Sequence, residues 1–309
     1  MTAALLGLVG LAGLGQQVQT VFEIDPGVGM LGAAGAGVSI VRGAETLYYN
    51  PASLAELPGI SFSSFYASHL GQANYSALAL TFRNWGVAAL LLNSTEIPGY
   101  DADGNPTDPL AYRNTGFIFG VGLDPTDLAF LPDFAIDMSL GARIKILTAQ
   151  VGEETGTGFS FDLGFRTRFP DMSFGALSIG EIALGVTAVN LFGGLTYDAA
   201  SDDFLMDIKL GGSALLAEFL RVAIDAHLAG SLHLGFVYEP IPTFALRVGL
   251  ISRSGVSVTA GLGINVEGFL LDYAYVSHVL GATHRVSLTL DFSSLDITAL
   301  SRSMRRLLP

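Results

Sequence analysis

From Gly59 to Phe292 the sequence repeats short segments in which apolar and polar residues alternate, with turn residues between the segments. A period of two places each kind of side chain on its own face of a β-strand. The chain is therefore predicted to be all-β over most of its length. In the last segment, one face carries Val286, Leu288, Leu290 and Phe292, and the other carries Arg285, Ser287, Thr289 and Asp291.

The alternation divides residues 59–292 into about fourteen predicted strands. An even number of antiparallel strands is typical of bacterial outer-membrane barrels. The predicted strands begin near Ile60, Asn74, Trp85, Arg113, Asp133, Gly158, Ser178, Phe204, Leu220, Ser231, Thr243, Gly255, Gly268 and His284.

The composition indicates what the apolar faces contact. Hydrophobic residues make up 50% of the chain and charged residues 14%, whereas soluble domains carry about 25% charged residues. No internal apolar run reaches the roughly 18 residues of a transmembrane helix. A closed barrel with apolar faces in lipid and mixed charges in its lumen accounts for both observations. A soluble sandwich, whose apolar faces would pack against each other, is the alternative.

One stretch does not fit the strand pattern. Gly27–Leu57 begins with small residues, which allow close approach to other backbone. Asn50 is a good N-cap and Pro51 a good first helical residue, and Pro58 follows where a helix would stop. We predict that residues 20–58 form a compact N-terminal hatch, or plug, inside the lumen of a barrel made by residues 59–292.

This stretch resembles the N-terminal hatch of FadL-type outer-membrane transporters and of the related PorV/PorQ proteins. The resemblance rests on the glycine- and alanine-rich run followed by Asn50-Pro51-Ala52 and Leu54. A second match, Asp272–Tyr275 with Leu280–Leu288, is similar to the closing hairpin of PorV/PorQ-like proteins. Together the matches cover about residues 27–292.

The resemblance implies an integral protein of the bacterial outer membrane that is not an enzyme. Two roles follow from it: transport of hydrophobic small molecules, or the carrying and anchoring of secreted or surface-layer proteins. A purely structural outer-membrane protein is a third alternative. The expected partners are outer-membrane lipid and either hydrophobic small molecules or secreted proteins.

An apolar pocket beside the hatch is the predicted ligand site, although packing of the hatch itself would use the same residues. Aromatic side chains gather at the end of the hatch and in the first predicted hairpin. The candidate ligand-binding residues are Leu47, Tyr48, Tyr49, Asn50, Pro51, Leu54, Phe62 and Phe65.

The two ends of the chain carry separate predictions. Residues 1–19 contain an apolar run of signal-peptide length, although no Lys or Arg precedes Arg42. A buried apolar arm is the alternative. Residues 293–309 hold Arg302, Arg305 and Arg306 and are predicted to form a basic periplasmic tail, either disordered or as a short docking helix.

Other chemistries find little support. The chain has no cysteine, and its net charge of −13 is unsuited to nucleic acid. Gly27–Gly32 matches G-x-G-x-x-G without the βαβ context of a nucleotide site, and no catalytic histidine or serine motif is present. No cofactor is therefore expected, and His227 and His233 are expected to approach each other as a polar contact.

Connection lengths give a test of the barrel. The two longest predicted connections, Ser94–Tyr112 and Asn190–Asp203, fall at the same end, whereas Asp124–Pro132 is long at the end where turns should be short. The first of these loops is a weak calcium-site candidate, because calcium prefers oxygen ligands, although a solvated turn is the simpler interpretation. Its oxygen-bearing residues are Asp101, Asp103, Asn105 and Asp108.

Overall fold

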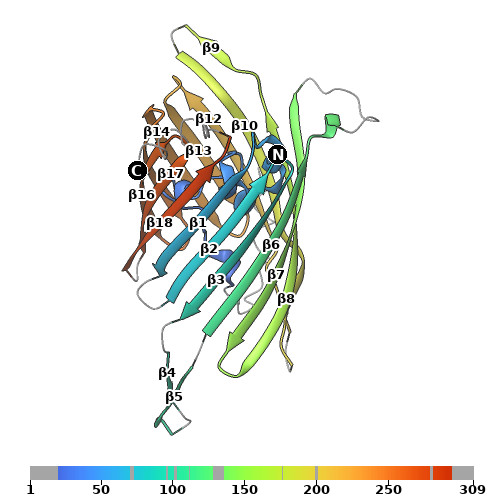
Figure 1. Cartoon of the computed structure of the whole chain (residues 1–309), viewed down its shortest axis with the longest axis vertical. Coiled ribbons are helices and arrows are strands. Elements are labelled where there is room, and N and C mark those ends of the chain that lie inside the picture. The colour runs from blue at the N-terminus through green and yellow to red at the C-terminus, as the bar shows by residue number, and fades with distance from the viewer. Residues whose placement is uncertain are drawn as a thin grey trace, which may run out of the picture.

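The structure is a computed structural model that describes residues 20–69, 73–94, 97–100, 103–110, 112–127, 136–175, 177–198, 201–278 and 281–293. Antiparallel strands form one continuous ring, because β1 pairs with β18 and β8 pairs with β10 (Figure 1). The prediction of a fourteen-stranded antiparallel barrel is confirmed. The fourteen barrel strands are β1 (Ser61–His69), β2 (Ala73–Phe82), β3 (Trp85–Ser94), β6 (Tyr112–Leu123), β7 (Asp137–Val151), β8 (Glu154–Arg168), β10 (Leu177–Thr196), β12 (Asp207–Leu216), β13 (Leu220–His227), β14 (Ser231–Ile241), β15 (Phe244–Ser252), β16 (Val256–Val266), β17 (Phe269–His278) and β18 (Gly281–Asp291).

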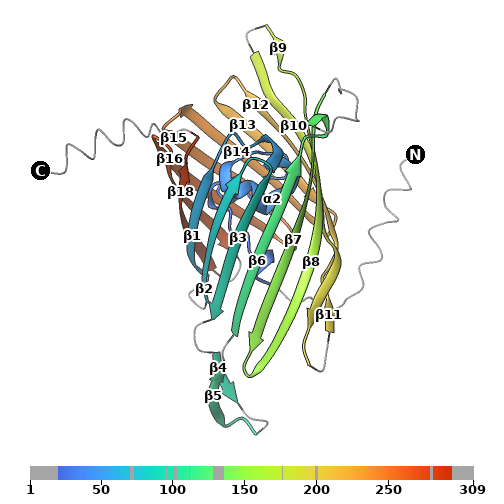
Figure 2. The ribbon, with the colours of Figure 1, turned by 45° about the vertical axis from the view of Figure 1, so that its right-hand side comes forward.

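Short strands extend the two ends of the barrel. At one end, β4 (Ile97–Tyr100) and β5 (Pro106–Leu110) form a separate hairpin, and β11 (Ser201–Asp203) lies at this same end (Figure 2). We call it the hairpin end. At the opposite end, where β1 begins and β18 finishes, β9 (Met172–Phe174) pairs with the start of β10 (Figure 1). We call this the terminal end.

In the barrel, apolar side chains face outward and charged side chains face inward, which is the reverse of the arrangement in a soluble protein. On β7 the outward-facing Ile144 and Ile146 are 43% and 52% exposed, whereas Arg143 and Lys145, which alternate with them, are 5% and 4% exposed. The alternative of a soluble sandwich is therefore wrong, because the apolar faces do not meet each other. Within the described residues, no helix is both long and apolar enough to span a membrane.

One predicted connection is corrected by the structure. Asn190–Asp203 is not all loop, because β10 continues to Thr196. The strand bulges where the pairing of β10 with β8 shifts register between Ala188 and Phe192. Asn190, at φ 55°, is held there because its N–H donates to the buried Asp162 carboxylate at 2.7 Å. Turn-forming residues at this point therefore mark a bulge within a strand.

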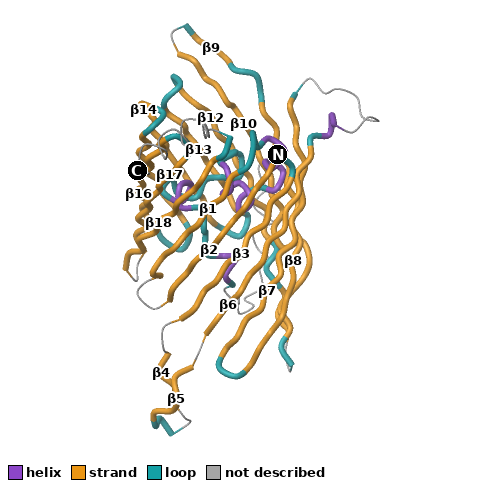
Figure 3. Tube along the Cα trace, viewed as in Figure 1, coloured by secondary structure: helices purple, strands orange, loops and turns teal. Residues whose placement is uncertain are grey.

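Residues 20–58 lie against the inward faces of the strands, and we call them the inner segment (Figure 3). The predicted helix after Asn50 is present as a 3₁₀-helix, and the Asn50 side chain caps it. Residues 1–19 and 294–309, with the predicted signal peptide and nearly all of the basic tail, lie outside the described residues. The helical turns of the inner segment are η1 (Val21–Glu23), α1 (Val28–Leu31), η2 (Gly43–Glu45), α2 (Thr46–Tyr49) and η3 (Pro51–Glu56).

Candidate functional site

The lumen toward the hairpin end is apolar on one side. Inward positions of β1, β2, β3, β6, β7, β10 and β17 carry apolar side chains that are at most 6% exposed. This departs from the polar interior of a water-filled porin. We call this surface the apolar lumen wall: Phe65, Ala67, Tyr75, Ala77, Leu90, Leu92, Ile118, Leu147, Ala149, Leu195 and Ala274.

The start of the inner segment covers this wall. Val21 and Ile24 pack into the same apolar cluster. The Tyr75 hydroxyl lies 3.1 Å from the Val21 carbonyl oxygen and 2.9 Å from that of Ile24. Phe65 packs edge-on to the Tyr75 ring, with 4.9 Å between ring centroids. The apolar lumen wall is thus occupied by the chain itself in this structure.

Charged side chains line the rest of the lumen in compact networks. The Asp162 carboxylate accepts Arg143 Nε at 2.5 Å and Lys145 Nζ at 3.0 Å. Because Asp162 is fully buried and both cations are nearly so, one carboxylate offsets part of the charge of two cations away from water. The Lys145 ammonium also lies 5.6 Å from the centre of the Phe22 ring.

A second network joins the inner segment to the barrel. Asp272 on β17 accepts Arg42 Nη2 at 2.7 Å and Arg247 Nη1 at 2.6 Å. Arg42 Nε also pairs with Glu45 at 3.3 Å, and both Arg42 and Glu45 belong to the inner segment. Asp272 therefore links β15 and the inner segment, because it pairs with one guanidinium group from each.

Asp25 forms a third polar contact of the inner segment. Its carboxylate accepts the Tyr49 hydroxyl at 2.6 Å and the Gly27 N–H at 2.8 Å. Burial of Asp25 raises the pKa of its carboxyl above the usual value. Arg285 Nη1 on β18 donates to the Asp25 carbonyl oxygen.

The structure brings together only part of the predicted ligand site. Leu47, Leu54 and Phe65 belong to one buried apolar cluster, and Tyr48 packs against it. Tyr49 packs against a different cluster. Phe62 lies on the opposite face of β1 from the buried Phe65, because successive residues of a strand alternate. Pro51 is buried as the first residue of η3.

Asn50 fastens the inner segment to itself and to the barrel. Its Oδ1 accepts the Ala52 N–H at 3.0 Å, and its Nδ2 donates to the carbonyl oxygens of Val38 at 2.8 Å and Phe165 at 2.9 Å. The side chain is fully buried. Sequence reasoning predicts the cap alone, which is worth about 1 kcal/mol.

Asn50→Ala is expected to lower the free energy of unfolding by about 3 kcal/mol, since three buried hydrogen bonds are lost at about 1 kcal/mol each. Asn50→Asp is the matched variant, because it keeps the capping oxygen and loses both donated bonds. Thermal unfolding in detergent measures both. If Asn50→Asp is as stable as the native chain, the cap is the whole contribution of Asn50.

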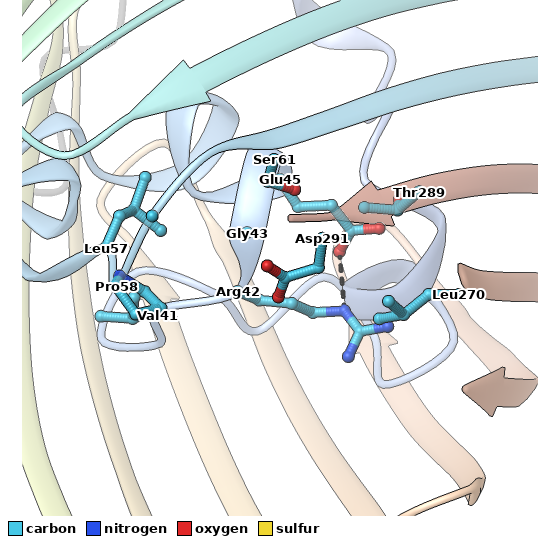
Figure 4. A pocket seen from close by; sticks show the side chains of 11 residues that line it. Val41, Arg42, Gly43, Glu45, Leu57, Pro58, Ser61, Leu270, Thr289 and Asp291 are labelled. Atoms are coloured by element: carbon cyan, nitrogen blue, oxygen red, sulfur yellow. Dashed lines mark ion pairs between the residues drawn. The ribbon is translucent and has the colours of Figure 1, made fainter. Parts of the chain in front are cut away.

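A cavity of about 220 Å³ lies between the inner segment and strands β1, β17 and β18, near the terminal end. Figure 4 shows Arg42 within it, with its ion pair to Glu45, beside Leu270 of β17. Apolar and polar groups share its lining. The lining residues are Val41, Arg42, Gly43, Glu45, Leu57, Pro58, Gly59, Ser61, Leu270, Thr289 and Asp291.

No metal centre emerges from the described residues, in which no three His, Cys, Asp or Glu side chains gather as ligands. His227 and His233 do approach each other, with stacked rings 4.3 Å apart, and His233 Nδ1 lies 2.7 Å from the Ala34 carbonyl oxygen. Asp103, Asn105 and Asp108 lie in or beside the β4–β5 hairpin. Because Asp101 is outside the described residues, the calcium site stays a prediction.

Comparisons with known proteins show the fold. No family model matches the chain, and no curated protein matches it. Among solved structures, the Pseudomonas putida toluene transporter TodX is 11% identical with a TM-score of 0.52, covering 88% of this chain and 98% of TodX. The monoaromatic hydrocarbon channel CymD is 12% identical with a TM-score of 0.52, covering 86% and 96%. A Pseudomonas aeruginosa FadL homologue is 10% identical with a TM-score of 0.50, covering 87% and 98%.

These neighbours are outer-membrane barrels, of which one is described as a toluene transporter, one as a hydrocarbon channel and one as a FadL homologue. The likeness extends over nearly the whole length of each. The chain therefore has the fold of an integral outer-membrane β-barrel, as its alternating strands and low charge predict.

Proposed function

We propose that the protein carries hydrophobic small molecules across the outer membrane by binding them in its lumen, without making or breaking bonds. The observation that supports this most directly is the apolar lumen wall. The interior of a water-filled pore is polar, whereas this lumen carries Tyr75, Leu90 and Leu92 on its inward faces. Such side chains favour contact with apolar solutes over contact with water. The described structural neighbours of the same fold include a toluene transporter and a hydrocarbon channel.

In this proposal the inner segment is the hatch. Val21 and Ile24 occupy the apolar lumen wall in the structure, so an entering apolar molecule competes with them for the same surface. The entering molecule must displace the contacts of η1 and the two hydrogen bonds from Tyr75 to backbone carbonyls. Leu47 and Leu54, from the predicted site, form part of the surface beneath.

Leu92→Gln tests the proposal. Leu92 faces inward and is 5% exposed, whereas the neighbouring Leu91 faces outward and is 37% exposed. A buried amide without a partner weakens binding of an apolar molecule by about 1–2 kcal/mol, roughly tenfold. We expect the uptake rate of the dye N-phenyl-1-naphthylamine, measured by fluorescence in cells producing equal amounts of folded barrel, to fall by that factor. Leu91→Gln is the matched control and should leave uptake unchanged.

An equal effect of both substitutions would contradict a role for the lumen. Uptake by native cells no faster than by cells without the protein would contradict transport itself. The role as a carrier or anchor of secreted or surface-layer proteins, implied by the PorV/PorQ resemblance, makes a different prediction: purification from native membranes would recover such a protein in stoichiometric amount. The apolar lumen wall favours transport.

A further inference from the structure

The inner segment is sealed against most of the ring by backbone contact. On each of eight barrel strands an inward glycine lies where even a methyl group would strike the inner segment. On β15, for example, a Cβ at Gly249 would lie 2.5 Å from Ala34 N. Contacts this close leave no passage along these eight strands. The sealing glycines are Gly122, Gly141, Gly164, Gly185, Gly211, Gly235, Gly249 and Gly261, on β6, β7, β8, β10, β12, β14, β15 and β16.

Six barrel strands carry no such glycine, and three of them, the neighbours β17, β18 and β1, are built differently. Across β17, β18 and β1 the described contacts to the inner segment run through side chains: Asp272 with Arg42, Arg285 with the Asp25 carbonyl, and Ser61 with the Ala44 N–H at 3.2 Å. Such contacts can rearrange without moving backbone. The 220 Å³ cavity lies on this same side, lined by Ser61, Thr289 and other residues of the three strands.

The inward face of β18 carries polar side chains along its length, and only some of their polar atoms are hydrogen-bonded within the described residues. Thr283, Arg285 and Ser287 are 4%, 6% and 4% exposed, yet Thr283 Oγ1, Arg285 Nε and Ser287 Oγ have no hydrogen-bond partner among the described residues. A buried polar atom without a partner costs about 1–3 kcal/mol, so these three positions favour an occupant that bonds to them. Thr289 and Asp291 continue the row into the cavity. Successive inward residues lie about 7 Å apart.

We propose that β18 forms the route past the inner segment, ending in the cavity at the terminal end, and that it suits hydrophobic molecules carrying one hydrogen-bonding group, such as aromatic alcohols. The polar row pairs with that group, while Leu270, Val41 and Leu57 contact the apolar part in the cavity. This inference rests on the proposed transport function. It goes further by naming the side of the ring and the chemistry of the substrate.

The chain has no cysteine, so a single introduced thiol can be blocked selectively. Thr289→Cys places the thiol in the cavity, and Leu288→Cys places it on the lipid-facing side of the same strand, where Leu288 is 43% exposed. We expect benzyl methanethiosulfonate to reduce dye uptake by the Thr289→Cys protein to the level of cells without the barrel. A reductant should restore it. The modified Leu288→Cys protein should transport as before.

Comparison before and after the reagent uses the same folded molecules, so a folding defect cannot imitate the block. Normal uptake by the modified Thr289→Cys protein would overturn the route while leaving the transport function standing. Absence of uptake by the native protein would instead overturn the transport function. In that case failure of the Thr289→Cys thiol to react with the reagent would also contradict an open cavity.

Binding of two matched ligands tests the substrate class. Benzyl alcohol and toluene differ by one hydroxyl group, and one hydrogen bond changes affinity by about threefold to tenfold. We expect calorimetric titration of the detergent-solubilised protein to show this preference for benzyl alcohol, and Ser287→Ala to reduce it. Equal affinities in the native protein, or an unchanged ratio in Ser287→Ala, would contradict the role of the polar row.

Discussion

Asp162→Asn is expected to destabilise the barrel by about 3–5 kcal/mol, the cost of leaving buried charges without their partner. Asp162 is fully buried and forms ion pairs with both Arg143 and Lys145. It also accepts the Asn190 N–H at the bulge of β10, so the same change loosens the pairing of β8 with β10. Thermal unfolding in detergent, followed by the loss of the compact form on gels, measures the effect.

The same two strands supply the control. Asp137 and Arg168 also face each other across β7 and β8, 2.6 Å apart, but their side chains are 66% and 51% exposed. An exposed ion pair contributes about 0–1 kcal/mol, so Asp137→Asn should be nearly silent. If the two substitutions cost the same, burial does not determine the worth of these pairs. A triple replacement of Arg143, Lys145 and Asp162 by apolar residues should recover much of the loss.

Gly249→Val is expected to displace the inner segment from the lumen and to lower the free energy of unfolding by about 3 kcal/mol. The clash is with backbone, so movement of side chains cannot relieve it. The new Cβ would lie 2.5 Å from Ala34 N and 2.7 Å from Ala34 Cβ. Ala34 itself has φ 62°, so its backbone has little freedom to yield. Limited proteolysis should cut within residues 20–58 of the variant while the strands stay intact.

Gly255→Val is the matched substitution. Gly255 precedes β16 and has no atom within 4 Å of an added Cβ. It should leave both the inner segment and the unfolding temperature unchanged. Protease resistance of residues 20–58 in the Gly249→Val protein would show that the backbone contact there is not what holds the segment.

The strands could be predicted from the sequence because alternation is a local signal. Leu220 and Ser231 are the observed first residues of β13 and β14, and Trp85 is that of β3. The cap at Asn50 was equally local, because it joins Asn50 to Ala52. The other two Asn50 contacts could not be predicted, since Val38 is brought near by the fold of the inner segment and Phe165 by the position of β8 beside it.

The parts of the site that escaped prediction depend on which strands face one another. Arg143 and Asp162 are partners because β7 and β8 pair in one register. The sealing glycines carry a weaker signal: Gly122, Gly164 and Gly185 replace the larger side chains expected on inward positions. A search for glycine on the polar face of each predicted strand would have found them. Phe62 does not join Phe65 in the lumen, because the two residues are three apart on β1 and therefore face opposite sides.

The glycine contacts constrain how the chain assembles. Val38 N–H donates to Asp225 across 187 residues of sequence, and Ala34 N–H donates to Thr259 across 225. The inner segment lies in close contact with eight strands, so its insertion into a finished ring would meet steric clashes. We expect it to occupy its position while the later strands form around it. Loop closure over such distances is slow. We therefore expect the inner segment to take its place while the barrel forms, before β18 pairs with β1.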